Sequence, residues 1–109
     1  MTIPDFSFQT IDWNNVPVEE HKGETGTATW QILHVGDIRI RKLVYSPNYK
    51  ADHWCKKGHI IHCLEGEMDS ELDDGRIMKL SKGMSYIVGD NCEAHRTSTR
   101  NGCVLFVVD

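Results

Sequence analysis

Residues of metal-ligand type lie between positions 52 and 95 at spacings that a β-sheet could bring together. His53 and Cys55 are two positions apart, so in an extended strand both side chains leave the same face, with Cα atoms about 6.6 Å apart. His59 follows a corner at 56–58, so it opens the next strand of a hairpin and can face back toward that pair. His95 comes from a much later strand, as expected where a barrel gathers distant strands around its interior.

This combination of side chains restricts the chemistry. Imidazole and thiolate ligands favour Zn, Fe, Ni or Cu over hard cations such as Mg or Ca. Three alternatives remain open: a polar lining without an ion, an inert buried thiol at Cys55, or a redox-sensing thiol there. Two further residues are candidates for roles around the ligands, although a structural role is equally open for both. Tyr86 could face the pocket, and Glu93 could orient a ligand histidine.

The four cysteines, Cys55, Cys63, Cys92 and Cys103, fit no small disulfide scaffold. The chain contains no Cys-x-x-Cys pair, which argues against a zinc ribbon or a thioredoxin-type redox centre. We therefore expect free thiols or metal ligands.

The elements that must position these residues are expected to be β-strands. No long stretch keeps apolar residues at helical spacing, whereas short β-branched and aromatic runs broken by Gly, Asn and Asp recur throughout. About ten strands in so short a chain predict an all-β sandwich or barrel. We expect them at 6–9, 27–35, 38–45, 50–55, 59–64, 67–72, 76–80, 84–88, 94–99 and 103–108.

One strand changes its pattern partway along. Ile38 and Ile40 alternate with arginines, but the next apolar residues, Leu43 and Tyr45, fall on the opposite parity. A β-bulge near residues 41–42 would explain the change.

The length and charge of the chain indicate a single domain. It has 109 residues and a formal net charge of -4, which suits one core with an arm and connection at 1–26 and a barrel at 27–109. The arm carries Phe6, Phe8 and Trp13, which need a surface to cover them, either their own barrel or a neighbouring subunit. A homodimer is the expected state.

The same features argue against several classes of partner. The longest apolar run, 104–108, is far shorter than a membrane span. No secretory signal is recognisable near residue 1, which favours a cytoplasmic protein. Lys56-Lys57 is the longest basic cluster, too little for nucleic-acid binding.

The stretch from Asp52 to Asp109 resembles a cupin. The family's first motif is Gly-x5-His-x-His-x3–4-Glu-x6-Gly, and this chain offers His53-x-Cys55-x3-His59-x6-Gly66, with Cys and His in place of the second His and the Glu. Gly83 and His95 match positions of the second motif, His95 one residue late. The segments 52–59 and 105–109 are similar to small single-domain cupins with a D-H-C-W signature.

This resemblance implies a double-stranded β-helix, or jelly-roll barrel, with one divalent transition metal held inside by His53, Cys55, His59 and His95. Because this set is softer than the family's usual three His and one Glu, it shifts the expected metal toward zinc, or toward ferrous iron if a coordination position stays open. Two functions follow as hypotheses. One is a metal-dependent oxygenase or isomerase acting on a small molecule in the barrel; the other is a non-catalytic binding or sensing protein with a structural metal or none.

Overall fold

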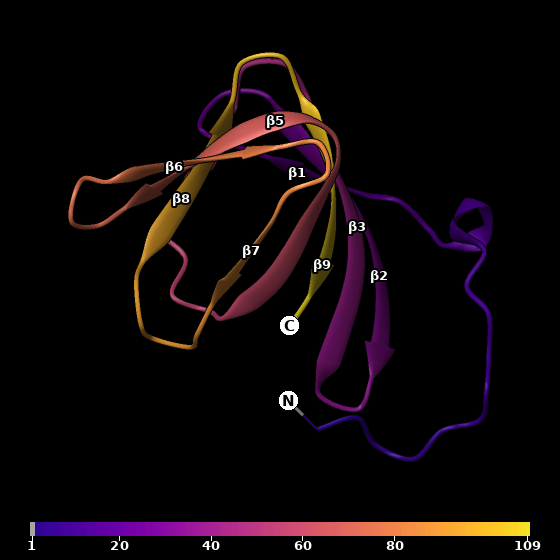
Figure 1. Cartoon of the computed structure of the whole chain (residues 1–109). Helices are drawn as coiled ribbons and strands as arrows, with labels where there is room; N and C mark the ends of the chain where they lie inside the picture. The colour runs from indigo at the N-terminus through magenta and orange to yellow at the C-terminus, as the bar shows by residue number, and fades with distance from the viewer. Residues whose placement is uncertain (1) are drawn as a thin grey trace.

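The computed structural model describes residues 2–109. Its regular structure consists of strands and one short 3₁₀-helix, η1 (Figure 1). In chain order the elements are η1 (Trp13–Asn15), β1 (Glu19–Lys22), β2 (Thr27–Val35), β3 (Ile38–Tyr45), β4 (Tyr49–Lys50), β5 (His59–Leu72), β6 (Ile77–Ser81), β7 (Ser85–Val88), β8 (His95–Thr99) and β9 (Cys103–Val108).

Strand β5 belongs to both halves of a curled antiparallel sheet. Its first half pairs with β9 and β7, and β9 continues through β3 and β2 to β1. Its second half pairs with β6 and β8, and β8 continues to β4. Between the halves the register shifts at Cys63/Glu65, and Gly66 has a φ of 75°. The strand therefore bends there, and Figure 1 shows it passing across the top of the barrel.

The core lies between the two halves of this sheet. Alternation along β9 buries Cys103, Leu105 and Val107, which face inward while their neighbours face out. The buried cluster as a whole contains Leu43, Ile61, Cys63, Met68, Leu80, Cys103, Leu105 and Val107. All four cysteines of the chain are free.

The predicted all-β architecture is confirmed, and the bounds expected for β2, β3 and β9 match the structure. The separate strands at 59–64 and 67–72 are one bent strand, β5. Two expectations are wrong: residues 6–9 form no strand, and the strand at 50–55 shrinks to β4 plus an isolated bridge at Cys55. The polar connection also contributes an unexpected strand, β1.

The bulge expected near residues 41–42 is also wrong. Both pairings of β3 run through that region without a register shift. The alternation is interrupted because Arg41 itself lies on the inward face and is buried with Leu43. Polar residues thus occupy part of the barrel interior.

No helix among residues 2–109 combines the length and the apolar character needed to cross a membrane.

Candidate metal centre

Three of the four predicted ligands come together inside the barrel. Cys55, His59 and His95 each offer one ligand atom, and these atoms lie within 4.8 Å of one another. His59 and His95 are buried, and Cys55 is half-buried. The Cys55 Sγ lies 3.3 Å from the His59 Nε2, and the rings of His59 and His95 meet edge to face with centroids 5.1 Å apart.

Backbone pairing fixes two of these residues relative to each other. Cys55 and His95 form an isolated antiparallel bridge with two hydrogen bonds, of 2.8 Å from the Cys55 N–H and 2.9 Å from the His95 N–H. His95 opens β8, and His59 opens β5. The three side chains therefore project from paired, hydrogen-bonded backbone.

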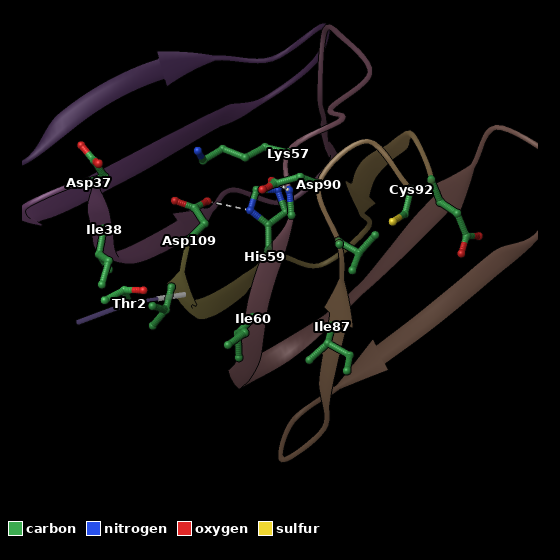
Figure 2. Close-up of a pocket in the computed structure, with 15 residues that line it drawn as sticks. Thr2, Asp37, Ile38, Lys57, His59, Ile60, Ile87, Asp90, Cys92 and Asp109 are labelled. Carbon is green, nitrogen blue, oxygen red and sulfur yellow. Dashed lines mark hydrogen bonds and ion pairs between the residues drawn. The ribbon is translucent and has the colours of Figure 1, made fainter. Parts of the chain in front are cut away.

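A buried carboxylate orients His59. The Asp109 Oδ2 accepts a hydrogen bond of 2.6 Å from the His59 Nδ1 (Figure 2). This leaves the Nε2 of His59 directed at Cys55. The Asp109 side chain is only 1 % exposed. It also accepts hydrogen bonds of 2.8 Å from Arg39 Nε and Arg41 Nη2. This is the carboxylate–imidazole pairing that commonly holds a ligand histidine in one orientation.

A backbone carbonyl does the same for His95. The His95 Nδ1 donates to the Glu93 carbonyl oxygen over 2.9 Å, so the Nε2 carries a free lone pair. Within the described residues this buried Nε2 has no hydrogen-bond partner. Glu93 thus contacts His95 through its main chain, while its carboxylate pairs with Arg76.

One pair of these atoms lies at the separation that a transition metal would impose. For Zn–S near 2.3 Å and Zn–N near 2.0–2.1 Å, tetrahedral geometry places sulfur and nitrogen about 3.5 Å apart. The observed 3.3 Å between Cys55 Sγ and His59 Nε2 is close to that value. An orphaned imidazole nitrogen beside a sulfur and a second imidazole is the arrangement that a soft divalent cation would complete.

The ionisation of the Cys55 thiol favours the same interpretation. The hydrogen bond with His59, aided by the nearby His95, lowers the pKa of the Cys55 thiol to about 5, so the sulfur is a thiolate at neutral pH. Burial and the Asp109 and Cys55 contacts act in opposite directions on His59, and the contacts prevail, raising its pKa. Burial opposes the charge on Asp109, but His59 and Arg39 outweigh it and hold the pKa of that carboxyl well below its usual range.

The structure does not bring His53 into this group. Its side chain is 76 % exposed, and its Nδ1 lies 2.6 Å from the Asp52 carboxylate. It does line the same cavity as the three candidate ligands. Ligation by His53 therefore stays a prediction.

The three residues line a cavity of about 230 Å³ inside the barrel. Its walls combine aromatic and apolar side chains with arginines. Tyr86 is one of the wall residues, with its ring centroid 6.3 Å from that of His95, and burial raises the pKa of its hydroxyl. A larger cavity of about 910 Å³, drawn in Figure 2, lies on the other side of His59 and shares only that lining residue with the first.

Sequence reasoning missed two residues of this region, Asp109 and Arg41. Asp109 meets His59 across 50 positions of sequence, and no local spacing signals such a contact. Arg41 did leave a signal, because it occupies an inward position of β3 where alternation predicts an apolar residue.

No family model matches the sequence, and no curated protein matches it significantly. Solved structures do match. The polyketide cyclase RemF from Streptomyces resistomycificus is 23% identical, with a TM-score of 0.77 over 94% of this chain and 78% of its own. An RmlC-like cupin from Shewanella frigidimarina is 18% identical, with a TM-score of 0.73 over 94% of this chain and 89% of its own.

A third match, described as a predicted oxalate decarboxylase from Thermotoga maritima, is 14% identical, with a TM-score of 0.77 over 92% of this chain and 96% of its own. At these identities the likeness shows the fold alone. The chain therefore has the cupin jelly-roll fold, as the motif resemblance implied, whereas membership of the D-H-C-W subgroup stays a prediction.

Proposed function

We propose that the protein is a metal-dependent enzyme that acts on a small molecule in the barrel cavity. One divalent transition metal would be held by Cys55, His59 and His95. The observation that carries this proposal is the convergence of their ligand atoms within 4.8 Å at the wall of a cavity. The unpartnered, buried His95 Nε2 adds support, because a native protein seldom leaves such an atom without a partner.

The number of ligands favours catalysis over a purely structural role. Structural zinc sites use four protein ligands, whereas catalytic sites use three and keep one position for water or substrate. When bound, such an ion supplies a Lewis acid that polarises a substrate oxygen. Zinc fits the thiolate and two imidazoles best, and ferrous iron is the second choice.

The surrounding residues orient the site and supply a proton donor. Asp109 and the Glu93 carbonyl fix the two imidazoles with their Nε2 atoms toward Cys55 and the cavity wall. Tyr86 stays protonated at neutral pH because burial raises its pKa, so its hydroxyl can donate a hydrogen bond to a substrate oxygen that gains negative charge. A Lewis acid beside a neutral donor favours isomerisation, with oxidation at a ferrous ion as the other reaction class.

A non-catalytic role is the second candidate, and the position of His53 favours it. His53 lies two residues from Cys55 and lines the same cavity. If its side chain turned inward as a fourth ligand, the site would be closed, and the protein would bind or sense a small molecule without converting it.

The test is metal analysis of the purified chain beside four single alanine variants. We expect about one transition-metal ion per chain in the wild type and a loss of most of it in Cys55→Ala, His59→Ala and His95→Ala. His53→Ala is the matched control and is expected to keep its metal. If wild-type protein reconstituted with zinc or ferrous iron under reducing conditions binds neither, the proposal fails; if His53→Ala also loses the metal, the closed, non-catalytic site is favoured.

A further inference from the structure

A buried arginine borders the cavity and is only partly paired. Arg41 lies on β3, with its side chain 6 % exposed. Its Nη2 donates to the Asp109 Oδ2, and its guanidinium carbon lies 4.9 Å from the centroid of the Trp30 ring. Within the described residues its buried Nε has no hydrogen-bond partner. Such a donor normally has an acceptor, because an unpaired one costs free energy.

The arginines around the cavity outnumber the carboxylates that pair with them. Arg39 and Arg41 share a single carboxylate, that of Asp109. A third arginine of the cavity wall, Arg96, has its own partner in Glu71. One guanidinium of the first two therefore has no carboxylate of its own beside the cavity, and the carboxylate of a ligand would supply one.

The shape and walls of the cavity restrict that anion further. Its volume of about 230 Å³ lies below the roughly 300–1,000 Å³ of pockets that take drug-sized ligands, so the occupant is small. The walls include Trp30, Tyr86 and the stacked pair Tyr45 and Tyr49, whose ring centroids are 4.3 Å apart. Aromatic walls favour a flat or apolar body attached to the charged group.

We propose that Arg41 binds the carboxylate of a small organic acid in the cavity beside Cys55, His59 and His95. The planar fork of a guanidinium matches the two oxygens of a carboxylate. The Asp109 Oδ2 accepts hydrogen bonds from both Arg41 and His59, so an acid held by Arg41 lies next to the candidate metal ligands. The inference deepens the function proposed above and rests on it only in identifying the bound acid as the substrate class.

The test compares two probes of nearly equal shape, benzoate and the neutral benzamide. Calorimetric titrations would use the full chain, once loaded with zinc and once treated with a chelator. We expect benzoate to bind both forms, and benzamide to bind at least about tenfold more weakly, because a charge-assisted hydrogen bond typically contributes a factor of about 10–100. Inorganic phosphate should bind more weakly than benzoate.

Variants identify the residue responsible. Arg41→Gln removes the charge, and Arg41→Lys keeps it without the fork, so both should weaken benzoate binding about tenfold or more and leave benzamide binding unchanged. Arg100→Gln, at an exposed position, is the matched control and should bind benzoate like the wild type. Melting curves show whether each variant folds, and the comparison of the two probes on the wild type needs no variant.

Four outcomes would overturn the inference: equal binding of benzoate and benzamide, no binding of benzoate, unchanged benzoate binding in folded Arg41 variants, or a preference for phosphate. Benzoate binding by a chain that takes up no metal would refute the proposed function alone, so the two failures are distinguishable.

Discussion

Asp109 is the residue through which the candidate metal centre is joined to the barrel wall. Its carboxylate accepts hydrogen bonds from both His59 and Arg41 and so joins the two side chains. Arg39 adds two more. Because this carboxylate is almost fully buried, its charge is balanced by these partners and not by water.

Replacing this carboxylate tests its role at the site. Asp109→Asn should lower zinc affinity about 10- to 100-fold, because the amide holds the His59 ring less firmly and makes it a weaker ligand. It should also destabilise the fold by about 3–5 kcal/mol, because the Arg41 charge stays buried. Competition with a chromophoric chelator measures the affinity, and urea unfolding measures the stability.

Glu93→Gln provides the matched control for that change. The Glu93 carboxylate pairs with the exposed Arg76, and only its carbonyl contacts His95. Zinc affinity should therefore stay within about twofold of the wild type, and the free energy of unfolding within about 0.5 kcal/mol. Zinc affinity as high in Asp109→Asn as in Glu93→Gln would contradict the orienting role of Asp109.

At the same scale, sequence spacing could predict the candidate ligands but not their support. The hairpin corner and the closure of a barrel predicted that His59 and His95 would approach Cys55, and the structure places the three together. Strand parity, which paired His53 with Cys55, did not hold, because no strand spans residues 50–55. Asp109 and Arg41 could not be predicted in this way, because their contacts join β3, β5 and the residue after β9, which only the closed barrel brings together.

The element that shapes the site is β5, because its bend lets one strand serve both halves of the sheet. The bend depends on Gly66, where an added Cβ would lie 2.3 Å from the Gly102 carbonyl oxygen. Its φ of 75° is also one that other residues rarely adopt. His59 and Met68 lie on opposite sides of this point, so the bend positions a candidate ligand relative to the core.

A pair of alanine substitutions separates the effect of close packing from that of backbone conformation. Gly66→Ala should destabilise the fold by about 2 kcal/mol or more, because it adds a steric clash to an unfavourable φ. Gly75 has a φ of 94°, but no atom lies within 4 Å of a Cβ added there. Gly75→Ala should therefore lower the free energy of unfolding by only about 1 kcal/mol. Urea unfolding of both variants provides the comparison, and equal losses would contradict a packing role for Gly66.

Strands could be predicted well where alternation and a partner strand coincide. β2, β3 and β9 have clear apolar periodicity and pair side by side, so their expected bounds hold. Residues 6–9 have similar propensity but no neighbouring strand, and they form none. The bend of β5 was interpreted as a break between two strands, because a glycine within a continuous strand has the same sequence signature as a turn.

At the scale of the whole molecule, the N-terminal arm remains largely uncovered. The Phe8 side chain is 96% exposed, while Trp13 packs edge-on against Phe106 with ring centroids 6.3 Å apart. The outer face of the sheet also exposes Ile60 and Ile87. Exposed apolar groups of this size commonly mark an interaction surface.

We propose that a second copy of the chain covers these groups. Light scattering after size-exclusion chromatography should give the mass of a dimer for the wild type, and both Phe8→Ser and deletion of residues 1–14 should shift the equilibrium toward the monomer. Glu20→Gln, at an exposed polar position, is the control and should stay dimeric. A wild-type monomer whose behaviour is unchanged by the deletion would contradict this expectation.

The central claim is that Cys55, His59 and His95 hold one metal ion at the cavity wall. X-ray absorption spectroscopy of the zinc-loaded protein at the zinc edge tests it most directly. The account predicts one sulfur at about 2.3 Å and two imidazole nitrogens at about 2.0–2.1 Å, with a further light-atom ligand that is not imidazole. A zinc shell without sulfur, or with a single imidazole, would contradict it.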